Sequence, residues 1–234
     1  MPVRVGILII GSLYWRMDGR IRWRKCRLQE DVKWLVQVAI RYGRYSGQAP
    51  NRSYTMVFGG LPDTPSGQAL VVPCKKDVAT PNDLVKEAEW LWGAEQNHVP
   101  TSCSSAPASR ISPDGGWGCV ALLSNPTSTV PPPLLAEWAN RVAREGARYN
   151  VVNNSRRLVD AHGRLLIPWP TLLDGSPVPL DLLLATANDP EDPYPTVQQI
   201  AEAWNQHPDV DYFQANRQHG IHTFEDTEIE KLLH

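Results

Sequence analysis

The sequence predicts an α+β fold, because strand-like segments dominate its first half and helical segments enter at intervals after them. Hydrophobic residues make up 42% of the 234 residues and charged residues 21%. This composition can build a real core and excludes a disordered chain. The length fits one large domain, or one domain that carries a long extension.

The first half is expected to form mainly strands. Val3–Ile10 is short, rich in β-branched residues and ended by Gly11-Ser12, as expected of a buried strand. Arg20–Arg24 alternates polar and apolar residues, which indicates a half-buried edge strand or a loop. Short apolar runs between turn-rich segments predict three more strands: Val36–Tyr42, Tyr54–Phe58 and Gln68–Pro73.

Helices enter with Thr80–Asp83, which supplies capping residues for a helix over Leu84–Glu95. Three prolines at 131–133 begin a second helix that runs to about Glu145. The remaining segments predict three strands and two helices: Trp117–Leu123, Leu165–Ile167, Leu180–Thr186, Tyr194–Asn205 and a short helix from Asp226. We expect residues 1–125 to form the core and residues 126–234 to form an extension packed on it, as a single compact unit.

Charge is unevenly distributed, although the net charge is only −2. Residues 1–60 hold eleven lysines and arginines against three acids, and residues 181–234 hold eleven acids against two basic residues. Such asymmetry is typical of a protein that binds an anionic ligand or nucleic acid at its basic end. It is equally typical of a chain whose two ends pack together. Because no run of five like charges occurs, a nucleic-acid partner is not favoured.

Membrane and redox signals are weak. The longest apolar run near the start, Ile7–Ile10, is far too short to span a bilayer, and Arg4 before so brief a run does not make a signal peptide. The four cysteines (Cys26, Cys74, Cys103 and Cys119) lie far apart, without the spacing of a zinc site or a dense disulfide framework. We therefore expect a cytoplasmic protein with reduced thiols.

Three candidate sites have alternative interpretations at this point. Gly11-Ser12 after the first strand could offer backbone N–H groups to a carboxylate or carbonyl oxygen, or could be an ordinary turn. Glu95 at the end of its helix could have a raised pKa and act as a general base, or could be a solvated helix end. His219 and His222 have the spacing of a metal-ligand pair, but we expect them to be packing or surface histidines.

The order of these pieces resembles the γ-glutamylcyclotransferase-like family over about the first hundred residues. That family has a first strand that ends in Tyr-Gly-Ser, several barrel strands, and a helix that ends in a catalytic glutamate. Here Ile10-Gly11-Ser12-Leu13 takes the first position, Gln68–Pro73 is similar to the strand before the helix, and Asp83–Glu95 matches the helix. Ile10 stands where the family has its tyrosine.

A closer resemblance is to uncharacterised bacterial proteins with a Gly-Ser-Leu-x-Trp motif after the first strand. Gly11–Trp15 matches this motif, and the segments 39–46, 54–57 and 214–223 are also similar to theirs. This resemblance covers most of the chain loosely.

These resemblances imply a small mixed β-barrel with flanking helices and a C-terminal extension, and a cyclotransferase-like enzyme that acts on a γ-glutamyl-type amide or amine. Glu95 would be the catalytic acid and base, while Gly11, Ser12 and Leu13 would donate backbone N–H groups to the substrate. Arg44 and Ser46 would hold a substrate carboxylate. No metal or other cofactor is expected. The rival function is a non-catalytic binding protein that uses the pocket or the basic N-terminal face for an acidic peptide or nucleic acid.

Overall fold

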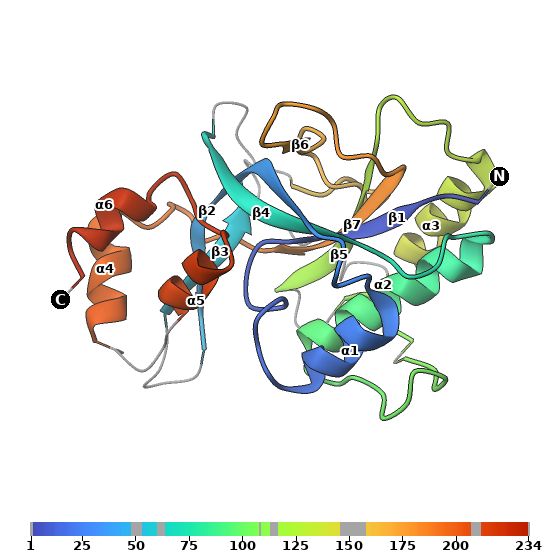
Figure 1. The fold of residues 1–234 in the computed structure, drawn as a ribbon, viewed down its shortest axis with the longest axis horizontal. Coiled ribbons are helices and arrows are strands. Elements are labelled where there is room, and N and C mark those ends of the chain that lie inside the picture. Colours follow the sequence, from blue (N-terminus) through green and yellow to red (C-terminus); the bar gives the residue numbers. More distant parts are fainter. Residues whose placement is uncertain are drawn as a thin grey trace.

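The computed structural model describes residues 2–47, 53–59, 64–107, 109–112, 117–145, 158–206 and 212–233. These residues form a mixed α+β fold, as the sequence predicts (Figure 1). In chain order the elements are β1 (Val5–Ile9), α1 (Gly19–Arg27), β2 (Trp34–Ser46), β3 (Ser53–Phe58), β4 (Ser66–Pro73), α2 (Pro81–Glu95), β5 (Gly118–Ser124), α3 (Pro132–Glu145), β6 (Thr171–Leu172), β7 (Leu182–Asn188), α4 (Val197–Asn205), α5 (Tyr212–Gln218) and α6 (Asp226–Glu230).

The strands make one seven-stranded mixed sheet in the order β3-β2-β4-β1-β7-β5, with β6 paired to β2. β1 runs parallel to β7 and antiparallel to β4. Every residue of β1 and of β7 is buried, as expected for central strands that are covered on both faces. The boundary expected after residue 125 falls between β5 and α3, and β7 from the second part lies between two strands of the first.

The expected β-barrel is not formed, because the described strands make an open sheet. Closure requires the two end strands of a sheet to pair with each other. Among the described residues the sheet ends at β3 on one side and β5 on the other, and these two strands are not paired. β2 is long enough to pair with β4 along residues 34–39 and with β3 along residues 40–46, and a bulge between Tyr42 and Arg44 interrupts its pairing with β3.

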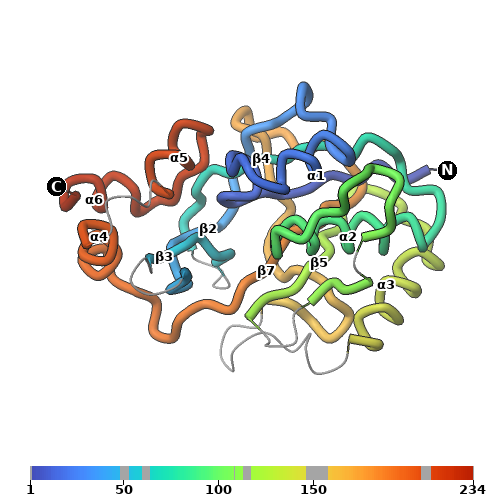
Figure 2. Tube along the Cα trace, turned by 90° about the horizontal axis from the view of Figure 1, so that it is seen from below, coloured from blue at the N-terminus to red at the C-terminus, as the bar shows by residue number. Residues whose placement is uncertain are grey.

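The helices form two groups at opposite ends of the molecule (Figures 1 and 2). α1 and α3 each pack against α2, which also contacts β5 and β7, whereas α4 packs against β3 and α6. α2 begins as the sequence predicts: the Thr80 hydroxyl accepts from the Asp83 N–H, and the Asp83 carboxylate accepts from the Thr80 N–H.

The expected edge strand or loop over Arg20–Arg24 is wrong, because this segment lies in helix α1. Asp18 caps the helix by accepting from the Arg20 N–H. Arg20, Trp23 and Arg24 are all buried, which is the three- and four-residue spacing of one helix face. The alternation of polar and apolar residues in this segment does not match an alternation of exposed and buried side chains, because Arg20 and Arg24 are buried. The predicted strand Leu165–Ile167 is also absent as a strand, since Leu165 makes only an isolated bridge to Val159.

The expectation of reduced thiols is wrong for two of the cysteines. Cys26 at the end of α1 and Cys103 form a disulfide, while Cys74 and Cys119 are free and buried. The disulfide ties α1 to the segment that follows α2. Disulfides persist mainly in oxidising compartments and are rare in cytosolic proteins. The expected cytoplasmic location is not tested by the structure and stays a prediction. Within the described ranges, no helix is long and apolar enough to cross a membrane.

Candidate functional site

One pocket of about 360 Å³ brings together every residue that the sequence singled out as a site residue. Its lining includes Gly11, Ser12, Leu13, Arg44, Ser46 and Glu95. The segment after β1 therefore shares a cavity with Glu95. The pocket also takes in residues that the sequence did not indicate: Arg16, Arg20, Trp117, Thr186, Asn188 and Tyr212.

The segment after β1 forms a tight turn with unused donors. The Tyr14 N–H donates to the Gly11 carbonyl at 3.3 Å, and the Arg16 N–H donates to the Ser12 carbonyl at 3.1 Å. In the part of the chain that the structure describes, no acceptor takes the N–H groups of Gly11, Ser12 or Leu13. Successive free backbone N–H groups at the start of a helical turn are suited to an anion or a carbonyl oxygen. The turn is thus more than a connection between two elements.

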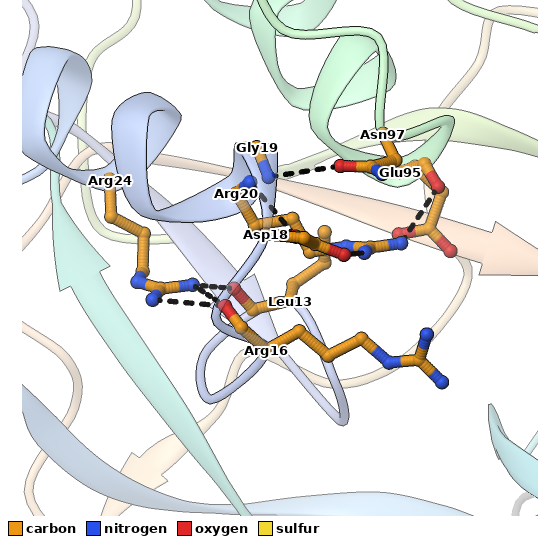
Figure 3. Close-up of polar contacts among 8 residues, drawn as sticks. All are labelled: Leu13, Arg16, Asp18, Gly19, Arg20, Arg24, Glu95 and Asn97. Atoms are coloured by element: carbon orange, nitrogen blue, oxygen red, sulfur yellow. Dashed lines mark hydrogen bonds and ion pairs between the residues drawn. The ribbon is translucent and has the colours of Figure 1, made fainter.

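Buried Arg24 holds this turn in place from α1 (Figure 3). Its guanidinium donates to the Leu13 carbonyl at 2.7 Å and to the Arg16 carbonyl at 3.3 Å. The same guanidinium donates through Nε to the Glu30 carboxylate at 3.1 Å. Because a guanidinium offers five donors in a rigid plane, one side chain fixes several acceptors at once. Arg24 therefore positions the free N–H groups without lining the pocket itself.

Glu95 is the last residue of α2, and its carboxylate is partly buried in the pocket. Burial raises the pKa of Glu95, and the charges of Arg20, Arg44 and Arg16 oppose that rise. A solvated helix end does not describe this environment. A carboxylate with a raised pKa is suited to accept and return a proton near neutral pH.

Arg20 links the start of α1 to the end of α2. It forms an ion pair with Asp18 and donates through Nη2 to the backbone carbonyl of Glu95 at 3.2 Å. Figure 3 shows its guanidinium between these two partners, with Asn97 accepting from the Gly19 N–H beside them. Arg20 thus fixes the backbone of Glu95 and places a positive charge next to its carboxylate.

Arg44 approaches the pocket from β2 and lies over an aromatic platform. Its guanidinium carbon is 4.2 Å from the ring centroid of Trp117, which in turn packs on Trp92 at 5.1 Å. Burial lowers the pKa of Arg44, and the charge of Glu95 is the largest effect that opposes this. No carboxylate within the described ranges forms an ion pair with Arg44. A stacked guanidinium that has no ion pair is available to a ligand carboxylate.

Arg16 adds a third positive charge from the turn after β1. Its side chain is exposed and extends away from Arg24, with no hydrogen bond or ion pair drawn to its guanidinium (Figure 3). The guanidinium lies 5.8 Å from the ring centroid of Trp15. Among its described lining residues the pocket therefore presents three arginines and one carboxylate, a charge balance that favours an anionic or zwitterionic ligand.

Tyr212 on α5 adds a tyrosine to the pocket lining, which also includes Ile10. Its hydroxyl accepts from the Met56 N–H at 3.3 Å, and burial raises its pKa to about 12. A Cβ atom on Gly11 would lie 2.4 Å from this hydroxyl, so only glycine allows the close approach. No local sequence signal points to Tyr212, because it lies two hundred residues after the turn that it contacts.

The two histidines with the spacing of a metal-ligand pair make contacts within the chain. The ring of His219 packs edge-on against Tyr14 at 5.2 Å, and the backbone of His222 pairs with Gln68. Among the residues that are described, no group of three or more His, Cys, Asp or Glu side chains is arranged to hold a metal ion.

No protein-family model, curated protein or solved structure matches this chain. The resemblance to the γ-glutamylcyclotransferase-like family therefore stays a prediction, and the pocket is interpreted from its own residues.

Proposed function

We propose that the pocket is the active site of a cyclotransferase-like enzyme that acts on a γ-glutamyl-type amide. The observation that carries the proposal is the shared pocket of the Glu95 carboxylate and the free N–H groups of Gly11–Leu13. A proton acceptor and a set of oxygen-binding donors within one small cavity are the two parts that amide transfer requires. Kinship with the γ-glutamylcyclotransferase-like family is part of this proposal.

The proposed reaction is an internal attack within the substrate. The α-amino nitrogen attacks the γ-carbonyl carbon, a carbon–nitrogen bond forms, and Glu95 takes the proton that the attacking nitrogen loses. The bond from that carbon to the leaving nitrogen then breaks, and Glu95 returns the proton to this nitrogen. The products are a five-membered lactam (5-oxoproline) and a free amine. The step consumes no water and requires neither a metal nor a nucleotide.

The surrounding residues have complementary parts in this proposal. Negative charge grows on the carbonyl oxygen in the transition state, and the N–H groups of Gly11, Ser12 and Leu13 would stabilise it. Arg44, stacked on Trp117, and Ser46 would hold the α-carboxylate of the substrate. Arg20 keeps the end of α2 in place while its charge limits the rise in the pKa of Glu95.

The rival function is a binding protein that takes a small anion in the same pocket without chemistry. The charge balance of the pocket supports binding as well as it supports catalysis, whereas the raised pKa of Glu95 favours the enzyme. A nucleic-acid interface is less favoured, because several arginines of the basic first part form ion pairs with carboxylates of this chain: Arg4, Arg20, Arg24, Arg27 and Arg41.

A screen of γ-glutamyl peptides and amides tests the proposal. Amine release and lactam formation are measured together for the wild-type protein and for Glu95→Gln. We expect at least one compound to release both products in equal amounts, with release that depends on Glu95. If no compound is converted, or if Glu95→Gln converts it at the wild-type rate, the binding function takes precedence.

A further inference from the structure

Two side chains at the end of β7 line the pocket, and each has an oxygen that no described residue pairs. Thr186 is 6% exposed and Asn188 is 8% exposed, and both belong to the pocket lining. The Thr186 Oγ1 and the Asn188 Oδ1 are buried atoms that have no partner in the described part of the chain. A buried polar atom that is left unpaired destabilises a folded protein, so such atoms are rare and call for an explanation.

The topology explains why these two residues face the site. Residues two apart on a strand point to the same face of the sheet, so Thr186 and Asn188 lie on one side of β7. β7 runs parallel to β1, and the carboxyl ends of neighbouring parallel strands meet at one edge. Gly11 follows the end of β1 and Asn188 ends β7, so the turn with free N–H groups and the residues Thr186 and Asn188 line the same cavity.

The two sides of the pocket differ in their hydrogen-bonding groups: one side donates hydrogen bonds and the other can accept them. Arg16, Arg20 and Arg44 can only donate hydrogen bonds, and the free N–H groups of the turn are also donors. The Thr186 hydroxyl and the Asn188 amide oxygen can accept them. A ligand that satisfies both sides therefore carries acceptors, such as carboxylate and carbonyl oxygens, together with an N–H donor.

We propose that Thr186 and Asn188 bind the amino group of the ligand and so restrict the pocket to compounds that carry a free amine beside their carboxylate. The inference rests on the proposed function, in which this amino group is the nucleophile. The attacking amine carries two hydrogens: Glu95 takes one, and the lactam nitrogen keeps the other. The Thr186 and Asn188 oxygens accept hydrogen bonds from this amino group as the ligand binds. Their hydroxyl and amide oxygens stay unpaired in the free protein because the ligand is their partner.

The test pairs a substitution with a change in the ligand. Thr186→Val keeps the shape of the side chain and removes the hydroxyl, and Thr186→Ser keeps the hydroxyl. The probes are γ-glutamylglycine and glutarylglycine, which lacks only the amino group. Affinities are measured by calorimetry in the Glu95→Gln background, so that the dipeptide is not consumed. We expect Thr186→Val to weaken the binding of γ-glutamylglycine about tenfold and to leave the binding of glutarylglycine unchanged. We expect Thr186→Ser to bind γ-glutamylglycine with the affinity of the Glu95→Gln parent.

The stability of the free protein is a second measurement. If the Thr186 hydroxyl had a structural role, Thr186→Val would lower the urea midpoint. Because the Thr186 hydroxyl is unpaired, Thr186→Val should leave the urea midpoint unchanged or raise it. The matched control is Thr223→Val, since Thr223 is equally buried but its hydroxyl donates to Asp226 at 2.6 Å. That control should lower the midpoint.

The outcomes separate this inference from the proposed function. Equal weakening of both probes, no weakening of either, or a midpoint that falls as in Thr223→Val would overturn the inference. If the wild-type protein converts γ-glutamylglycine while Thr186→Val binds normally, the enzyme stands and the inference fails. If no compound is converted but Thr186→Val weakens the binding of γ-glutamylglycine and not of glutarylglycine, the inference stands and the proposed catalysis fails. A wild-type pocket that binds neither probe overturns both.

Discussion

Two opposing effects act on the pKa of Glu95: burial raises it, and the charges of nearby arginines lower it. Burial disfavours the carboxylate, whereas Arg20, Arg44 and Arg16 favour it, and the balance leaves the pKa raised. A fully paired glutamate would hold its charge too firmly to exchange a proton. Among the described residues no carboxylate pairs with the guanidinium groups of Arg16 and Arg44, so in the proposed function the same residues tune the Glu95 carboxylate and attract the substrate.

The raised pKa predicts how stability depends on pH. The folded protein holds the Glu95 proton more tightly than the unfolded chain, whose glutamate pKa is about 4.3. This contribution to the free energy of unfolding is fully present below that value and is lost as pH rises through the folded-state pKa. Glu95→Gln cannot ionise, so we expect the variant to gain stability relative to the wild-type protein between pH 4 and pH 7.

Urea midpoints of both proteins across this range measure the difference. Other groups titrate equally in the two proteins, so the difference isolates Glu95. A difference that is constant with pH, or one that favours the wild-type protein as pH rises, would contradict the raised pKa.

Local sequence predicts only part of the site at the scale of residues. Gly11-Ser12 and Glu95 stand out because each follows a regular element at a position where backbone donors or a carboxylate can face a cavity. Tyr212, Thr186 and Asn188 carry no such signal, because their place in the pocket depends on which strands pair and on where α5 packs. These are long-range contacts that no spacing in the sequence encodes.

Among the elements, α1 and the turn before it behave as one unit. Arg24 donates to two carbonyl groups of the turn, and α5 holds the same turn from another side, where the Trp15 indole N–H donates to Asn216 at 2.7 Å. The sequence could not predict this arrangement, since five alternating residues fit a strand and a helix equally well. Asp18 as the helix cap decides for the helix.

Arg24→Met should loosen the turn. Met matches the aliphatic part of the Arg side chain but lacks the guanidinium, so the change removes the donors to two carbonyl groups. We expect the free energy of unfolding to fall by about 2 to 4 kcal/mol, as for other buried charged hydrogen bonds. Urea denaturation measures this. The control Arg22→Met, on the exposed face of the same helix, should stay within about 0.5 kcal/mol. Equal small effects for both variants would show that Arg24 does not hold the turn.

Across the whole molecule, the central place of β7 is the feature that the sequence did not predict. The strand itself was predicted from its apolar residues, but its pairing was not, and this pairing places Thr186 and Asn188 beside the first strand. The charge asymmetry is partly resolved between the two ends of the chain. Arg41 pairs with Glu225 at 2.7 Å and Arg4 with Asp181 at 3.6 Å, while Arg20, Arg24 and Arg27 pair with acids of the first ninety residues.

This pairing predicts weak binding to nucleic acid. Arginines that already face carboxylates release few counterions on contact with a phosphate backbone. We expect single- and double-stranded DNA and RNA to bind only at low salt and to be released before physiological ionic strength. Filter binding over that salt range measures it. Sub-micromolar affinity at physiological salt would make the basic face a nucleic-acid interface instead.

The kinetic effect of Glu95→Gln on the best substrate of the γ-glutamyl screen tests the central claim most directly. Gln keeps the shape of the side chain but cannot accept a proton, so kcat should fall roughly a hundredfold or more with KM nearly unchanged. The far-UV spectrum should match the wild-type protein, and Glu137→Gln, at the exposed ion pair with Arg144, should keep full activity. Full activity of Glu95→Gln would contradict the assignment of Glu95 as the acid and base of the site.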